Sequence, residues 1–207
     1  VYKYRLFVKT RNEWCNGVQY NIKQQSCEDI KVEYGGEVCL GTFAFSYKCR
    51  SKARQNVKEM IGGRLEYNPD KKEWFFRDNK RRIYDLSSTS EGTKKLSILD
   101  LLLGNRYLGN HSIVMIDEVE SNLHPSLISQ YLQTLLVLAR SGVQLFISSH
   151  SYFVIKYLFV MAHKERISIP VLSFDEGKCS VGDLMEEMPR NPIIEESIKL
   201  YREEISL

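Results

Sequence analysis

Two short apolar runs flank a helix-like pattern in the second half of the chain, and each run ends in polar residues. Residues 112–117 (SIVMID) and 143–149 (VQLFISS) both predict buried strands. Pro125 opens the intervening helix pattern and Gly142 closes it. A strand, a crossover helix and a second strand make a unit with parallel strands and a right-handed connection. The sequence therefore predicts an α/β fold with a parallel sheet and flanking helices.

The part of the chain before this unit alternates apolar and polar residues, which predicts antiparallel strands. The alternation runs over residues 1–49, Tyr47 included, and a short helix is expected over 51–61. A second antiparallel meander follows over 64–86. Two units are therefore expected: an antiparallel β-rich lobe with a short helix over 1–86, and an α/β half over 87–207.

Caps and turn residues place the remaining elements. Ser90 is expected to cap a helix over 91–103, because its hydroxyl can accept a backbone N–H of the first turn. After the parallel unit we expect a helix over 152–162, a strand over 168–174, a hairpin turn at 175–177 and a last helix that begins at Pro192 and is capped by Asn191.

Composition restricts the compartment and the partners. The cysteines form no C-x-x-C pair, and no histidine lies at the distance along the chain that zinc fingers use. Buried free thiols are therefore favoured over a structural zinc site. Free thiols, the lack of a secretory signal and the lack of an apolar run of ~18 residues predict a cytoplasmic protein without a membrane partner. A net charge of +3 is too small to predict a nucleic-acid partner by itself. The cysteines are Cys15, Cys27, Cys39, Cys49 and Cys179.

Three polar segments are expected to meet at one edge of the sheet. Asp117 and Glu118 follow the first apolar strand, and His150 follows the second. Ser90 and Gly92 stand at the start of a helix. Ligands of parallel sheets bind just beyond the carboxyl ends of the strands, so the fold delivers Asp117 and His150 to one crevice.

These residue types suit phosphate chemistry. Asp117 can support Mg²⁺, which prefers oxygen ligands. Glu118 can orient and deprotonate a water that attacks a phosphate, and His150 can donate to a γ-phosphate. Ser90 and Gly92 offer backbone N–H groups and the positive end of a helix dipole to an anion.

Each segment taken singly also has a plainer explanation. An Asp-Glu pair can be a solvated loop, Ser-x-Gly can be a simple helix cap, and His150 can be a core histidine with satisfied hydrogen bonds. The order and spacing of the three segments favour a functional site. The acidic residues near the end of the chain favour a solvated helix end over a metal site; these are Asp183, Glu186 and Glu187.

The same segments resemble the motifs of ABC-type ATPases of the SMC/RecF-like and overcoming-lysogenization-defect-like group. SIVMIDEVESNLHP is similar to their Walker B segment and D-loop, LSSTSEGTKKLSIL to their signature, and LFISSHS to their switch-histidine strand. The likeness extends from about Lys58 to Tyr157. Glu91 occupies the first glycine position of the transporter pattern L-S-G-G-Q, which points away from transporters.

The resemblance implies a fold, two cofactors and a set of residue roles. It implies an ABC-type, P-loop NTPase-like core that binds ATP and Mg²⁺, with Asp117 at the metal, Glu118 as the catalytic carboxylate and His150 as the switch histidine. It also implies a signature that contacts the nucleotide held by an opposite subunit, and a D-loop between the two sites. The signature residues are Ser90, Gly92 and Thr93, and the D-loop residues are Asn122 and Leu123.

One motif of this group is absent from the sequence. No G-x-x-x-x-G-K-[ST] loop, which would cradle the β-phosphate, occurs in the 207 residues. We therefore expect the sequence to be the C-terminal portion of a longer ATPase, and to hydrolyse no ATP alone.

The function implied is an ATP hydrolase that dimerises around ATP and controls a partner effector, such as a nuclease, in DNA repair or antiphage defence. The alternative is a non-hydrolysing regulatory or scaffold subunit with the same fold. A nuclease within this chain is disfavoured, because the fifty residues after Tyr157 contain no D-x-D motif. Retention of Asp117, Glu118 and His150 together favours the hydrolase.

Overall fold

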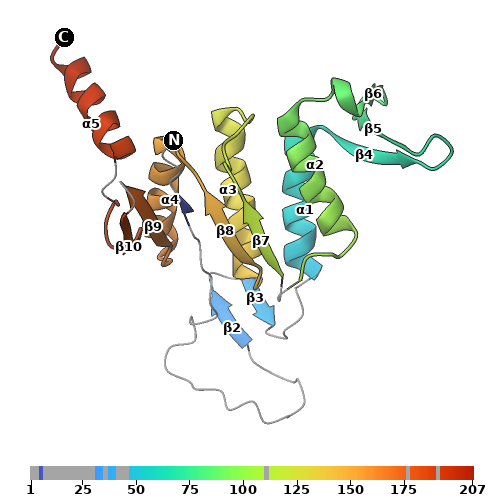
Figure 1. Ribbon diagram of the computed structural model, residues 1–207. Coiled ribbons are helices and arrows are strands. Elements are labelled where there is room, and N and C mark those ends of the chain that lie inside the picture. Colours follow the sequence, from blue (N-terminus) through green and yellow to red (C-terminus); the bar gives the residue numbers. More distant parts are fainter. Residues whose placement is uncertain are drawn as a thin grey trace.

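A computed structural model of the chain describes residues 5–6, 31–34, 37–40, 47–109, 112–175, 178–189 and 192–207 (Figure 1). The helices are α1 (Tyr47–Ile61), α2 (Glu91–Gly104), α3 (Pro125–Arg140), α4 (Tyr152–Glu165) and α5 (Pro192–Ile205), with a short 3₁₀ turn at Leu86–Ser88. The strands are β1 (Arg5–Leu6), β2 (Lys31–Tyr34), β3 (Glu37–Leu40), β4 (Gly63–Asn68), β5 (Glu73–Asp78), β6 (Ile83–Asp85), β7 (Ile113–Ile116), β8 (Gln144–Ser148), β9 (Pro170–Asp175) and β10 (Lys178–Asp183).

The predicted strand–helix–strand order and the parallel pairing are confirmed, but the prediction that 112–117 is a buried strand is wrong. Ile113 and Met115 of β7 are 59% and 77% exposed, because β7 is an edge strand of the sheet that the structure describes and no described element covers this face. β7 and β8 pair in parallel, with Ile113 opposite Gln144 and Ile116 opposite Ile147. β1 pairs antiparallel to the other edge of β8, which gives the order β1-β8-β7. Because β7 and β8 run side by side in the same direction, the residues that follow them emerge at the same edge (Figure 1).

Helix α3 carries the largest share of the core that supports this edge. His124 caps it, Pro125 is its first residue, and Gly142 follows its end with a φ of 98°, a conformation open to glycine. Its buried face repeats every three or four residues and includes Ile128, Leu132, Leu135 and Leu138. Helix α1 packs against both α2 and α3. The side chains of Arg54 in α1 and Asp100 in α2 form an ion pair at 2.8 Å.

Apart from the β1–β8 pair, the antiparallel strands that the structure describes lie in separate sheets. β4, β5 and β6 form the predicted meander, whose β4–β5 hairpin projects away from the parallel strands (Figure 1). β9 and β10 pair as a hairpin after α4, and β2 pairs with β3. The fold is thus mixed α/β with parallel and antiparallel sheets, as predicted. The division at residues 86 and 87 stays a prediction.

Two predictions about local structure need correction or lie outside the description. The first helix begins at Tyr47 and not at residue 51, so the strand predicted to include Tyr47 is wrong at that residue. Residues 47–50 contain no Gly or Pro to stop the helix from extending toward the N-terminus. The last helix begins at Pro192 as predicted, whereas its predicted cap, Asn191, lies outside the described residues.

The acidic cluster near the end of the chain is a turn and not a solvated helix end. Asp183 is the last residue of β10, and its carboxylate accepts hydrogen bonds from the backbone N–H groups of Ile169 (3.1 Å) and Met185 (2.7 Å) and from the Ser168 hydroxyl. An aspartate that satisfies neighbouring backbone donors stabilises the turn itself. In the part of the chain that the structure describes, no group of three or more His, Cys, Asp or Glu side chains could hold a metal ion.

The prediction of buried thiols is wrong for the one cysteine whose side chain is described. Cys179 is a free, exposed thiol on β10. It lies on a two-stranded hairpin, where an outward-facing side chain has no second layer to bury it. The side chains of the other four cysteines lie outside the description. Among the described helices, none is long and apolar enough to span a membrane.

The α3 core can be tested by truncating one side chain. Leu132 is 1% exposed, so Leu132→Ala should lower the free energy of unfolding by about 2–5 kcal/mol through lost burial and a residual cavity. Gln130→Ala, at an exposed position two residues earlier on the same helix, should change it by less than about 0.5 kcal/mol. Urea unfolding of both variants measures the difference, and equal losses would contradict the assignment of this helix face.

Candidate functional site

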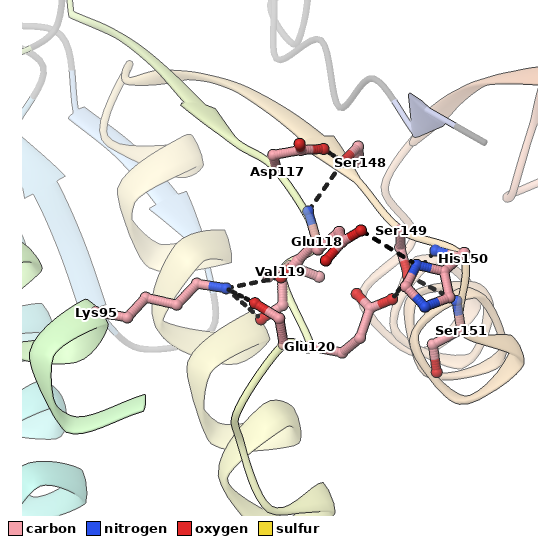
Figure 2. A network of polar contacts seen from close by, with 10 residues as sticks. Lys95, Asp117, Glu118, Val119, Glu120, Ser148, Ser149, His150 and Ser151 are labelled. Atoms are coloured by element: carbon pink, nitrogen blue, oxygen red, sulfur yellow. Dashed lines mark hydrogen bonds and ion pairs between the residues drawn. The ribbon is translucent and has the colours of Figure 1, made fainter. Parts of the chain in front are cut away.

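The turn that follows β7 is fastened to the end of β8 by one serine. The Ser148 hydroxyl donates a hydrogen bond to Asp117 Oδ1 and accepts one from the Glu118 N–H at 2.9 Å. The Val119 N–H donates to the Ser148 carbonyl at 3.2 Å. Figure 2 shows Asp117 and Ser148 facing one another across the two strand ends. The parallel pairing of β7 and β8 is thereby continued by side chains beyond the last residue of β7.

Glu118 adopts a backbone conformation that non-glycine residues rarely occupy. Its φ is +47°, in the left-handed region. The conformation is held on both sides, because the Glu118 N–H donates to Ser148 and the Glu118 carbonyl accepts from Lys95 Nζ at 2.7 Å. Strained residues of this kind persist only where their surroundings fix them, and they concentrate at functional sites. The Glu118 side chain is 46% exposed, so its carboxylate is accessible to a solvent molecule or a ligand.

His150 lies beside the same turn. Its Nδ1 atom is 3.9 Å from Glu118 Oε1 and 3.5 Å from Glu120 Oε1, and its backbone N–H donates to Glu120 Oε1 at 3.1 Å. Glu118 and His150, which are 32 positions apart along the chain, therefore meet at the edge of the sheet to which the parallel strands were predicted to bring Asp117 and His150.

Lys95, on helix α2, reaches into this turn from the opposite side (Figure 2). Its ammonium donates to the carbonyls of Glu118 (2.7 Å) and Val119 (3.2 Å) and to the Ser121 hydroxyl (3.2 Å). Burial lowers the pKa of Lys95, and the nearby carboxylates of Glu120, Glu118 and Asp117 oppose that lowering. The lysine thus places a partly buried positive charge under a turn that carries three carboxylates.

Sequence reasoning did not single out Lys95 or Glu120. Glu120 is the third acid in Asp-Glu-Val-Glu, and nothing in that spacing tells which of the three side chains is buried. Lys95 lies one helical turn after Glu91, on a helix whose surface residues are expected to be charged. The sequence feature that could have indicated Lys95 is its place within the signature-like segment, two residues after Thr93.

The start of α2 is built as the sequence predicted, with one added constraint. Ser90 is the N-cap, and its Oγ accepts from the Thr93 N–H at 3.2 Å and donates to Thr93 Oγ1 at 2.9 Å. Gly92 is buried, and a Cβ atom there would lie 2.2 Å from the Asn122 carbonyl oxygen and 3.0 Å from Leu123 Cδ2. Packing within the chain therefore requires a glycine at position 92. A contact of Gly92 with a nucleotide stays a prediction.

Asn122 and Leu123 form the other side of this contact. Asn122 has a φ of +59°, and the turn leads directly into the His124 cap of α3. The His124 Nδ1 atom accepts from the Ser126 N–H at 3.3 Å. In the part of the chain that the structure describes, neither Ser90 nor Thr93 bonds to Glu118 or His150. The predicted site residues thus fall into two groups, one around Glu118 and one around Ser90.

The oxygen donors near Asp117 fit Mg²⁺ bound together with phosphates. The Asp117 carboxylate and the Ser148 hydroxyl supply hard oxygen ligands, which magnesium prefers. Among the described residues no closed protein metal cage is present, and magnesium in nucleotide sites usually takes only one or two carboxylates and completes its shell with phosphates and water.

A comparison with known protein families shows which family this chain belongs to. The family described as "AAA domain, putative AbiEii toxin, Type IV TA system" matches residues 42–156, which is more than half of the chain. The chain belongs to this AAA domain family. The ATPase relationship expected from the motifs is thereby confirmed, and the matched region contains the β7–α3–β8 unit with Asp117, Glu118 and His150. Among curated proteins, none matches the chain.

Solved structures of SMC heads are also similar to the chain. The SMC head domain from Thermotoga maritima is 18% identical with a TM-score of 0.42, over 67% of this chain and 48% of that one. A structure described as the SmcHead bound to the C-winged helix domain of ScpA is 14% identical with a TM-score of 0.46, over 66% and 42%. The chain therefore spans less than half of these two heads. A third, from work on ATP-driven dimerization and DNA stimulated activation of SMC ATPases, is 14% identical with a TM-score of 0.44, over 75% and 92%.

The tight contact at Gly92 predicts a large effect for a small substitution. Gly92→Ala should lower the free energy of unfolding by about 1–3 kcal/mol, because the new methyl group would displace the Asn122 carbonyl. Gly109→Ala is the matched control, since a Cβ atom there meets nothing within 4 Å. Chemical denaturation of both variants measures the difference, and a Gly92→Ala variant as stable as the control would show that the two turns are not packed together.

Proposed function

We propose that this chain supplies the hydrolytic half of an ATP-hydrolysing AAA domain of the ABC type. The observation that carries the proposal is the meeting of Glu118 and His150 at 3.9 Å, beyond the carboxyl ends of two parallel strands and next to Asp117. Family membership supports ATP as the ligand. No loop of the kind that cradles a β-phosphate occurs in the 207 residues, so the proposal requires that another part of the ATPase assembly supplies it.

Asp117 is proposed to hold Mg²⁺ with the nucleotide. The Ser148 hydroxyl, anchored at the end of β8, restricts the rotation of the Asp117 carboxylate. When bound, the metal would neutralise charge on the β- and γ-phosphate oxygens. Ser148 therefore serves as the support of the proposed metal ligand.

Glu118 is proposed to act as the general base. Its exposed carboxylate can accept a proton from a water that approaches the γ-phosphate, while hydrogen bonds on both sides of the residue fix its backbone. His150 is proposed to face the γ-phosphate through Nε2, since Nδ1 is directed to the carboxylates. The two side chains would then act on neighbouring atoms of one reacting centre.

The second group of residues is proposed to serve a nucleotide held by another subunit. Ser90 and Thr93 lie at the exposed start of α2, where backbone N–H groups and the helix dipole favour an anion. They do not bond to Glu118 or His150, which suits a role toward a separate nucleotide. The proposed assembly is a dimer formed around ATP, with Asn122 and Leu123 between the sites. One of the similar SMC structures is itself described in terms of ATP-driven dimerization. We further propose that the dimer controls an effector protein, such as a nuclease, in DNA repair or antiphage defence.

The division of roles between the two adjacent acids is tested by paired substitutions. In the complete ATPase, Glu118→Gln should lower kcat by about 10²–10⁴-fold and still bind ATP, because only the general base is lost. Asp117→Asn should weaken Mg²⁺-dependent ATP binding as well. Both variants are measured for nucleotide affinity and turnover under one set of conditions. Turnover near the wild-type rate in Glu118→Gln would remove Glu118 as the base.

Substitutions at Ser90 test the proposed contact between the signature and the nucleotide held by the other subunit. Ser90→Asp keeps an acceptor for the N-cap but places a negative charge toward the triphosphate, so it should abolish ATP-dependent dimerisation while the free energy of unfolding changes little. Ser90→Arg should block dimerisation too, with some loss of stability from the missing cap. Sedimentation with and without ATP measures the assembly, and Ser206→Arg, at the exposed end of the chain, is the control. Dimers that persist in both Ser90 variants would disprove the trans contact.

A further inference from the structure

A buried carboxylate that the proposed hydrolysis does not use lies directly behind His150. The Glu120 side chain is 11% exposed, whereas Glu118 and His150 are 46% and 57% exposed. Carboxylates are rarely buried to this degree unless they are paired, because the loss of hydration is costly. The partners of Glu120 therefore indicate why it is buried.

One oxygen of Glu120 accepts a hydrogen bond from the backbone of His150 and lies close to its ring. Glu120 Oε1 accepts from the His150 N–H at 3.1 Å and lies 3.5 Å from His150 Nδ1. Figure 2 shows the Glu120 side chain extending from the turn to the imidazole. Glu118 Oε1 is farther from the same nitrogen, at 3.9 Å, and belongs to a more exposed side chain. Glu120 is thus the nearer and better fixed of the two carboxylates.

The position of Glu120 determines which ring nitrogen remains for other partners. A carboxylate can only accept a hydrogen bond, so its position beside Nδ1 favours the tautomer in which Nδ1 carries the proton. Among the described residues, none hydrogen-bonds to His150 Nε2. Carboxylates that bind one nitrogen of a functional histidine fix its tautomer and its orientation, as in carboxylate–histidine pairs at metal and hydrolase sites.

A positive charge from helix α2 lies near Glu120. Burial lowers the pKa of Lys95, and the nearby carboxylates of Glu120, Glu118 and Asp117 oppose that lowering. The Lys95 ammonium is held in place by the carbonyls of Glu118 and Val119. Glu120 Oε2 is buried and has no hydrogen-bond partner among the described residues.

We propose that Glu120 is a positioning residue that holds His150 as the Nδ1–H form, with Nε2 directed to the ligand side. This proposal rests on the proposed function for the identity of that ligand, the γ-phosphate of ATP. The pairing of Glu120 with His150 does not depend on nucleotide, so it can be tested separately.

The first experiment reads the tautomer without nucleotide. The complete protein is labelled with [¹⁵N]histidine, and the Nδ1 and Nε2 shifts of His150 are recorded at alkaline pH, where imidazole rings are neutral. A His150→Gln sample identifies the signals. The wild type should show Nδ1–H. Glu120→Met, which keeps the volume but removes the acceptor, should shift His150 toward Nε2–H, and Glu120→Gln, which keeps an oxygen acceptor, should restore Nδ1–H.

The second experiment measures ATP turnover in the same variants of the complete ATPase. Glu120→Met should lower kcat by about tenfold to a hundredfold with little change in KM, the loss typical of a carboxylate that orients a histidine. Glu120→Gln should recover most of that loss. In a His150→Ala background, Glu120→Met should cause no further loss, because the two residues act as one unit. Glu196→Ala removes an exposed carboxylate on α5 as the control.

Three results would overturn the role of Glu120. They are an unchanged His150 tautomer in Glu120→Met, a tautomer in Glu120→Gln that matches Glu120→Met, and a kcat loss that adds fully to that of His150→Ala. If Glu120→Met does not fold, Glu120→Ala carries the same comparison. A wild-type protein that shows the Nδ1–H form but no ATP turnover would disprove the proposed function and leave the Glu120–His150 pairing standing.

Discussion

The candidate site depends on the parallel pairing of β7 with β8. Without it, Asp117 and His150 would be two unrelated polar residues 33 positions apart. Strand pairing alone fixes only the backbone up to Ile116, and the Ser148 hydroxyl extends it by bonding to both Asp117 and Glu118. A hydroxyl can donate and accept at once, and it does so here across two strand ends. Replacing that single group would remove both of these bonds, and the Val119 N–H would still bond to the Ser148 carbonyl.

Burial divides the polar residues of the turn into fixed and accessible groups. The Glu120 side chain is only 11% exposed and Lys95 is partly buried, and both bond to the backbone of the turn or of His150. The Glu118 carboxylate and the His150 ring are about half exposed. Under the proposed function, the exposed pair would act on an external ligand, and the residues behind it would fix the orientation of that pair. The positive φ of Glu118 belongs to the same arrangement, since donors and acceptors on both sides hold a conformation that the residue would otherwise avoid.

Sequence patterns predicted the parts of this structure that depend on hydrophobic periodicity and on strand ends. The β7–α3–β8 unit, the Ser90 cap and the meeting of Glu118 with His150 follow from such patterns. Glu120 and Lys95 were not predicted, because both were singled out by burial at one side of a turn. Burial of turn residues follows no repeating pattern of apolar residues in the sequence. The start of α1 at Tyr47 was missed because alternating residues can continue into a helix when no glycine or proline intervenes. Asp183 was misassigned because its backbone partners, Ile169 and Met185, are defined only after β9 and β10 pair.

The two groups of candidate residues are joined within one chain although they are proposed to serve different nucleotides. The first turn of α2 touches the 117–123 turn at two points: Gly92 lies against the Asn122 carbonyl with no room for a methyl group, and Lys95 bonds to the carbonyls of Glu118 and Val119. A packed contact resists compression, and a set of charge-assisted hydrogen bonds resists separation. The start of α2 therefore cannot shift far in either direction without moving the backbone that carries Glu118. Under the proposed function, the surface that meets the opposite nucleotide and the carboxylate that acts on the chain's own nucleotide would consequently move as one unit.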